Sequence, residues 1–180
     1  MTAFISPPKR IPFYLRAGLW FAQRIAGVEL LPPRLLAWYP KALISSGVLE
    51  AMIAHDEEGV DARLLKIVRM TVSFVVNCPF CMDMNSNGWE KLITSDELTA
   101  LQEKRDLADV DSFSERERLA VVYARLVSRT PLSFPAELIE QLKAVFSERE
   151  IVILATTAAQ VNYWARLIQA LGCPPPGLSE

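Results

Sequence analysis

Residues Leu64–Gly88 read LLKIVRMTVSFVVNCPFCMDMNSNG. Apolar residues recur at helical spacing in the first half of this stretch, which predicts an amphipathic helix over 61–76. The segment 72–76 is rich in valine and also suits a strand when propensity alone is considered. The second half begins with Cys78-Pro79-Phe80-Cys81. Proline suits the first turn of a helix, because its missing N–H would have no partner there, so two helices are expected to meet at a pair of cysteines.

Helix signals continue toward the C-terminus. Three capping boxes, in which a Ser or Thr is followed three residues later by Glu, predict helix starts at Thr94, Ser114 and Ser147. Another helix is expected over 135–146, and Gly172 with the prolines behind it should end the last helix. Only seven glycines occur in 180 residues, which argues against a turn-dense β fold. The prediction is an all-α domain of seven to nine helices.

Proline and glycine divide the first 60 residues. Pro12 is expected to open a first helix that Pro32 and Pro33 close, and shorter helical segments follow, separated by Pro40 and Gly47. The first of these helices is amphipathic and aromatic. It either packs as an arm on the core or on a neighbouring subunit, or it lies on a membrane surface. Its arginines leave no uncharged window long enough for a membrane span.

We therefore expect one domain with three parts. These are an N-terminal helical arm over 1–60, a core over 61–172, and a proline-rich, frayed tail over 173–180. No secretory signal pattern is present at the N-terminus, so a cytoplasmic location is expected.

Composition excludes several classes of function. Nineteen Lys and Arg face 21 Asp and Glu, a formal charge of −2, so there is no basic footprint for nucleic acid. The single histidine, His55, excludes most His-based metal sites and weakens any catalytic triad. We expect neither a metal nor a cofactor.

The cysteine pair carries the sharpest chemical signal. Two thiols at i and i+3 lie on one face of a helix start, where the helix N-terminus favours the reactive thiolate. Three interpretations compete: a redox dithiol, an inert pair of core cysteines, and a zinc half-site. A zinc site would need two more ligands. The only other His and Cys in the sequence are His55 and Cys173, and they are not spaced as a second ligand pair. A thioredoxin-like fold would need strands after the motif, where the sequence is helical, so the redox dithiol on an all-α fold is favoured.

The stretch Leu64–Gly88, together with the phrases F-S-E-R-E-R-L-A (113–120) and F-S-E-R-E-I-V (146–152), resembles the peroxidase-related branch of the carboxymuconolactone decarboxylase / AhpD-like superfamily. The resemblance covers roughly residues 48–172. It implies a helical bundle, a homo-oligomer, and an alkylhydroperoxidase-like oxidoreductase that reduces a peroxide at the expense of a dithiol reductant. It further implies that Cys81, the deeper thiol, attacks the peroxide and that Cys78 resolves the sulfenic acid to a disulfide.

The proton relay of the peroxidase members does not carry over. Those members place a Glu twelve residues before the first cysteine and a His four residues after the second, and here the two positions hold Lys66 and Asn85. Neither side chain acts as a carboxylate base or an imidazole shuttle at neutral pH. Asp83 is either a substitute acid/base or a solvent-facing acid favoured by the helix dipole. Lys66 either lowers a thiol pKa by its charge or is a solvated lysine.

Two further functions stay open. One is a lactone decarboxylase-like enzyme that acts on a small lactone without cysteines. The other is a non-catalytic helical module in which the dithiol staples two helices, for which the missing relay is the best argument. Asn162 and Arg166 share a face of the last helix and line the pocket, a subunit interface or a polar outer face, whereas Cys173 is expected to be a bystander.

Overall fold

The structure, a computed structural model, describes residues 3–178. This part of the chain forms nine α-helices and two short 3-10 helices and contains no strand, so the all-α prediction is confirmed. The helices are α1 (Phe13–Ala26), α2 (Leu31–Leu36), α3 (Pro40–Ala51), α4 (Ala62–Val75), α5 (Pro79–Ser86), η1 (Trp89–Lys91), α6 (Ser95–Leu101), η2 (Leu107–Asp109), α7 (Glu115–Val127), α8 (Ala136–Val145) and α9 (Glu148–Ala170).

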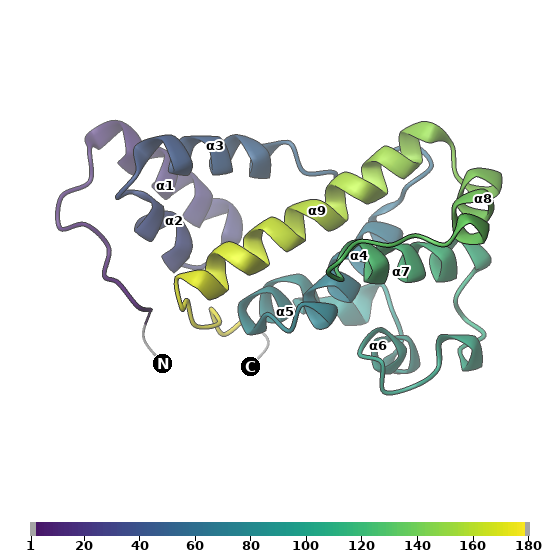
Figure 1. Cartoon of the computed structure of the whole chain (residues 1–180). Coiled ribbons are helices and arrows are strands. Elements are labelled where there is room, and N and C mark those ends of the chain that lie inside the picture. The colour runs from purple at the N-terminus through teal and green to yellow at the C-terminus, as the bar shows by residue number, and fades with distance from the viewer. Residues whose placement is uncertain (1–2, 179–180) are drawn as a thin grey trace.

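Helix α9 is the axis of the fold. It crosses the molecule diagonally and packs against α4, α5, α7 and α8 (Figure 1). Apolar side chains of α4, α7, α8 and α9 form the main core beneath it, among them Leu65, Val68, Val72, Ala124, Leu142, Leu154 and Ala158. By length and composition α9 could cross a membrane, but its apolar residues are those that a central core helix needs.

The helix boundaries confirm most of the sequence signals. All three capping boxes are present, with both reciprocal hydrogen bonds, at Thr94, Ser114 and Ser147. The ambiguous valines belong to α4, since the helix continues to Val75 and buries Val72 completely. Gly172 follows the last helix with φ +65°, the left-handed conformation expected of a helix-ending glycine.

The arm differs from the prediction in two places. Helix α1 ends at Gly27, which has φ +70°, and Pro32 and Pro33 lie in the first turn of α2 instead of closing α1. Proline lacks only an N–H that the first turn leaves unpaired, so it opens a helix as readily as it ends one. Gly47 does not separate two helical segments, because α3 continues through it from Pro40 to Ala51.

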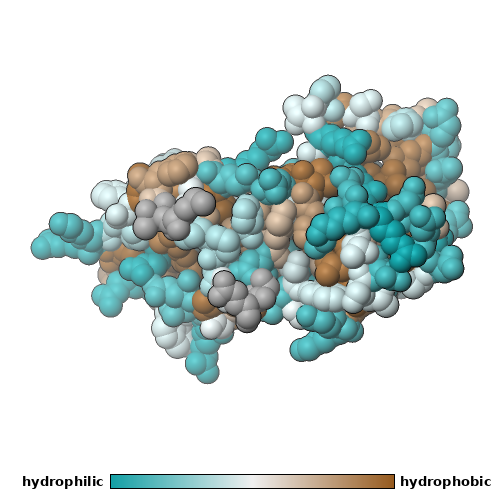
Figure 2. All heavy atoms as spheres, turned by 90° about the horizontal axis from the view of Figure 1, so that it is seen from below, coloured by the Kyte–Doolittle hydropathy of each residue, from teal (hydrophilic) through white to brown (hydrophobic). Residues whose placement is uncertain are grey.

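Hydrogen bonds connect the N-terminal arm to the rest of the protein. Helix α3 lies near α9 (Figure 1), and the Ser46 and Tyr163 hydroxyl groups form a hydrogen bond of 2.9 Å between them. The Gln160 amide donates to the Leu49 carbonyl. Many large apolar side chains of the arm nevertheless stay exposed, and brown hydrophobic surface is visible at that end of the molecule in Figure 2. They include Phe13, Tyr14, Trp20, Phe21, Ile25, Trp38, Tyr39 and Met52.

The described part of the C-terminal tail is not frayed, contrary to the prediction. Asp83 of α5 accepts hydrogen bonds from the backbone N–H groups of Gly177 (2.6 Å) and Leu178 (2.9 Å). The N-terminal segment reaches the same region, since the Phe4 N–H donates to the Leu171 carbonyl. Sequence patterns predict few such contacts, because they join residues far apart in the chain.

Candidate active site

A sharp backbone turn places the two cysteines at the junction of α4 and α5. Helix α4 ends at Val75, and Asn77 adopts φ +48°, the left-handed conformation that asparagine tolerates better than most residues. The Cys78 N–H then donates back to the Ser73 carbonyl at 3.3 Å. Cys78 becomes the N-cap of α5 and Pro79 fills its first turn, as predicted.

The two sulfurs are joined in a disulfide, with the Cα atoms 5.2 Å apart. Such a separation is ordinary for a disulfide. Cys78 Sγ also accepts the backbone N–H of Cys81 at 3.2 Å, so it occupies the place of an N-cap oxygen. The side chains of Cys78 and Cys81 are 0% and 3% exposed. Cys81 is therefore not the deeper of the two, because α9 and the tail cover both.

The disulfide lies in a small apolar cluster of its own, which we call the cysteine cluster. Its buried members are Cys78, Phe80, Cys81, Ala165 and Ile168. Half-buried side chains from the arm, both neighbouring helices and the tail pack around it: Leu30, Val76, Met84, Trp164 and Cys173. Burial raises the pKa of the Cys173 thiol, which keeps it protonated at neutral pH. The predicted bystander thus lies against the redox pair without itself being activated.

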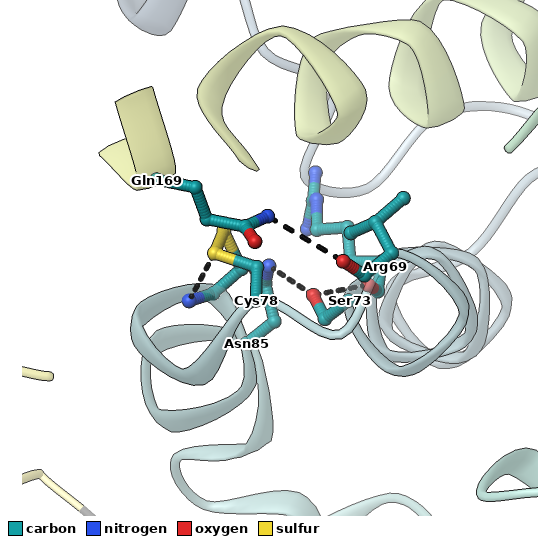
Figure 3. Close-up of a disulfide and its surroundings, with 7 residues drawn as sticks. Arg69, Ser73, Cys78, Asn85 and Gln169 are labelled. Atoms are coloured by element: carbon teal, nitrogen blue, oxygen red, sulfur yellow. Dashed lines mark hydrogen bonds between the residues drawn. A yellow bond between two sulfur atoms is a disulfide. The ribbon is translucent and has the colours of Figure 1, made fainter. Parts of the chain in front are cut away.

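Asn85 lies where the relay histidine was expected, on the same face of α5 as Cys81 four residues earlier. Its Nδ2 donates to Ser73 Oγ at 2.9 Å, and the Ser73 hydroxyl donates to the Arg69 carbonyl at 2.8 Å (Figure 3). The serine has one hydrogen, and a carbonyl only accepts. The Ser73 oxygen must therefore accept from Asn85, which fixes the orientation of the carboxamide beside the disulfide.

Lys66 lies at the opposite end of α5 from Cys78. Its Nζ donates to the carbonyl of Asn87, the C-cap residue, at 2.6 Å. The two caps are nine residues apart along α5, which corresponds to about 13.5 Å. Burial, together with the nearby charge of Arg69, lowers the pKa of Lys66. Its visible role is to hold the loop that follows α5.

Asp83 is buried, with 7% of its surface exposed, so the solvent-facing interpretation is wrong. Its carboxylate receives the N–H groups of Gly177 and Leu178 and so anchors the tail on the cysteine helix. Helix α5 thus carries Cys81 and the anchor of the segment that follows Cys173.

The polar residues of α9 divide between two sides. Asn162 donates to Ser128 Oγ, and Arg166 to Thr130 Oγ1, so both contact the end of α7 and the loop behind it. Trp164 instead packs on the cysteine cluster and donates its indole N–H to Glu50 at 2.9 Å.

Three residues around the cysteine cluster and its neighbours were missed in the sequence. Ser73 orients Asn85, and Gln169 lies beside the disulfide and donates to the Val76 carbonyl (Figure 3). Glu50 accepts from Trp164 and Gln160. Burial lowers the pKa of Arg69, and the charge of Glu50 offsets only part of that effect. Ser73 could have been found as a polar residue in the apolar stripe of α4. Within residues 3–178 no group of three or more His, Cys, Asp or Glu side chains could hold a metal ion.

Comparison with solved structures defines the class of the fold. A variant of the debrominase Bmp8 with one cysteine replaced by alanine, in complex with 2,3,4-tribromopyrrole, matches with TM-score 0.79 and 18% identity over 99% of this chain and 94% of that one. A peroxidase-related protein from Ralstonia eutropha JMP134, described as an alkylhydroperoxidase AhpD core, matches with TM-score 0.78 and 15% identity over 98% and 94%. The chain therefore has an AhpD-like all-α fold.

Similar sequences add a relative without an assigned activity. The uncharacterized protein YnjA of Escherichia coli K12 is 27% identical over 175 residues, which cover 97% of this chain and 94% of that protein. No protein-family model matches the sequence. A further peroxidase-related protein, from Silicibacter sp. TM1040, shares the fold with TM-score 0.78 and 17% identity over 98% of this chain and 92% of that one.

Proposed function

We propose that the chain is a thiol-dependent oxidoreductase that reduces peroxides through Cys78 and Cys81. The observation that carries the proposal is the Cys78–Cys81 disulfide at the N-terminus of α5, inside a small apolar cluster. Such a pair can cycle between dithiol and disulfide by exchange with an external dithiol. The AhpD-like fold and the peroxidase-related neighbours support the same chemistry.

The cycle begins with a thiolate attacking the distal oxygen of a hydroperoxide, ROOH. The S–O bond forms, the O–O bond breaks, and the alkoxide leaves as ROH after taking a proton from water. The second thiol attacks the resulting sulfenic acid, water leaves, and the Cys78–Cys81 disulfide closes. An external dithiol then reduces the disulfide by exchange and is itself oxidised. One hydroperoxide and one dithiol give one alcohol, one water and one oxidised dithiol.

The hydrogen bond at the helix start supports Cys78 as the attacking thiolate. Its sulfur accepts the Cys81 N–H at 3.2 Å, and both this bond and the positive end of α5 favour the anion. The superfamily resemblance assigns the attack to Cys81 instead, aided by a Glu and a His. This chain has Lys66 and Asn85 at those positions, so the helix terminus is the stabilising feature that remains.

The direct test measures consumption of cumene hydroperoxide by the full chain with dithiothreitol as reductant. Activity should fall at least about a hundredfold in Cys78→Ser and in Cys81→Ser, since each removes a partner of the disulfide. Cys173→Ser is the matched control and should keep the rate. If either Cys78→Ser or Cys81→Ser retains full turnover, the proposal fails.

The burial of the disulfide favours a second candidate, a non-catalytic staple between α4 and α5. A staple predicts a disulfide that resists dithiothreitol in the folded protein. A lactone decarboxylase-like activity would instead survive loss of both cysteines. Reductive debromination would consume the same two thiol electrons, so a brominated pyrrole belongs in the same assay.

We propose a homo-oligomer working in the reducing cytoplasm, where a dithiol can be regenerated. The exposed aromatic side chains of α1, among them Phe13 and Phe21, support self-association because monomers rarely leave such groups uncovered. Analytical ultracentrifugation of the full chain measures the assembly, and a monomer at all concentrations would contradict it.

A further inference from the structure

The arm carries a groove between α1 and α2 with a volume of about 250 Å³. Its lining combines aliphatic side chains, the indole of Trp20, and polar and charged side chains. The lining residues that matter here are Arg16, Leu19, Trp20, Glu29, Leu30 and Arg34.

One side chain joins this groove to the redox pair. Leu30, the N-cap residue of α2, lines the groove and also packs on the cysteine cluster. Cys78 and Cys81 are themselves buried, so a substrate must approach them through a covering residue. Leu30 packs on the cluster that contains both cysteines, and it also lines the groove.

The side chains that line the groove carry a net positive charge. Its lining holds two arginines and one glutamate, and Arg34 forms an ion pair with Glu29. The guanidinium of Arg16 has no ion-pair partner within residues 3–178. The chain as a whole carries a net charge of −2, so this local excess of positive charge is a property of the groove.

We infer that the groove binds the substrate of the dithiol, and that this substrate is a compact apolar hydroperoxide bearing a carboxylate. The inference rests on the proposed peroxide-reducing function. The apolar body lies against Leu19, Trp20 and Leu30, and Arg16 receives the carboxylate through charge-assisted hydrogen bonds. The peroxide end faces Leu30 and reaches the thiolate when that side chain moves aside. The chemical step is unchanged: sulfur takes the distal oxygen and the carboxylated alcohol leaves.

The test compares two hydroperoxides that differ by one carboxylate, cumene hydroperoxide and its 4-carboxy derivative, with dithiothreitol as reductant. The full chain should prefer the carboxylate about fivefold in kcat/KM, the upper range for a solvent-exposed ion pair. Arg16→Gln should abolish the preference, mainly by raising KM, while Arg16→Lys retains part of it. Arg10→Gln, an exposed arginine outside the groove, is the matched control. Equal kcat/KM for both compounds, or a preference that survives Arg16→Gln, overturns the inference.

Binding of 4-isopropylbenzoate, which has no O–O bond, separates this inference from the proposed function. Calorimetry should detect binding to the wild-type chain and about fivefold weaker binding to Arg16→Gln. If the benzoate binds in this Arg16-dependent way but neither hydroperoxide is consumed, the anion site stands and the peroxidase proposal fails. If both hydroperoxides are consumed but the benzoate does not bind, the peroxidase proposal stands and the groove is overturned.

Discussion

The sulfur of Cys78 accepts the backbone N–H of Cys81 at 3.2 Å, so the first cysteine of the pair, and not the second, is the cap of helix α5. A thiolate in that position receives a hydrogen bond and the positive end of the helix dipole, both of which favour the charged form. The two cysteines are equally buried, so exposure does not distinguish them.

The first prediction concerns the order of the two thiol pKa values. Two variants each keep one thiol of the pair: Cys81→Ser keeps Cys78, and Cys78→Ser keeps Cys81. The Cys78 thiol should have the lower pKa, because the backbone N–H of residue 81 is still present in Cys81→Ser and can donate to it. The pH dependence of alkylation by iodoacetamide measures both values, in a Cys173→Ser background that removes the third thiol. A lower pKa for Cys81 would reverse the assignment of roles.

A second prediction restores a base to the site. In Asn85→His the Ser73 oxygen can accept from one imidazole N–H, which leaves the other nitrogen free to take a proton. We expect peroxide turnover to rise about tenfold, the low end for a positioned acid/base group. The gain should increase with pH through about 6.5, where histidine loses its proton.

Asn87→His supplies the matched control, because Asn87 is exposed at the far end of α5. An equal gain in Asn85→His and Asn87→His, or none in the former, would show that the Ser73–Asn85 pair does not face the reacting thiol.

The third prediction concerns the tail anchor. Asp83→Asn replaces one accepting oxygen by an NH2 group, which cannot accept the N–H groups of Gly177 and Leu178. The free energy of unfolding should fall by about 1–3 kcal/mol, and the amides of Gly177 and Leu178 should exchange with solvent faster. Urea unfolding and hydrogen exchange measure these effects. Asp111→Asn, at an exposed loop position, should change neither; if Asp83→Asn behaves the same way, the anchor is not formed.

The fourth prediction concerns stability against acid. Burial raises the pKa of the Glu97 carboxyl, but hydrogen bonds from Arg63, the Thr94 N–H and Ser112 outweigh it and hold the pKa below the ordinary 4.5. As the pH falls, the folded protein therefore binds this proton at a lower pH than the unfolded chain does. The stability that Glu97 contributes is complete above pH 4.5 and is lost as the pH falls through the folded value.

Glu97→Gln should cost about 3 kcal/mol at pH 7, since it leaves Arg63 with a weaker buried partner, and the loss of stability below pH 4.5 should become shallower. Urea midpoints at pH 7, 5 and 3.5 give the comparison, with Glu90→Gln, an exposed glutamate, as the control. An acid profile identical to that of the wild type would exclude Glu97 as its source.

Much of the fold could be predicted from local signals. The capping boxes at Thr94, Ser114 and Ser147 satisfy helix ends with neighbouring residues, so the sequence alone identifies them. Proline and glycine were less informative. Pro32 opens a helix and Gly47 lies inside one, because proline fits the first turn of a helix and a glycine is tolerated inside one.

The candidate site also has one part that local sequence signals predict and one part that depends on tertiary contacts. The Cys78–Cys81 pair follows from spacing, whereas the partners of Asp83 and Asn85 come from residues 94 and 12 positions away. Such contacts exist only after tertiary folding. Ser73 is the exception, because a small polar residue on the buried stripe of α4 must satisfy its hydroxyl within the fold.

The most direct measurement of the central claim is a single turnover of the reduced chain with one equivalent of cumene hydroperoxide. Quenched samples are counted for free thiols and mapped by mass spectrometry. We predict that two thiols disappear per hydroperoxide, that the product is the Cys78–Cys81 disulfide, and that the reaction is at least about a hundredfold faster than with free cysteine. A rate equal to that of free cysteine, or oxidation confined to Cys173, would contradict the assignment of this dithiol as a peroxide-reducing centre.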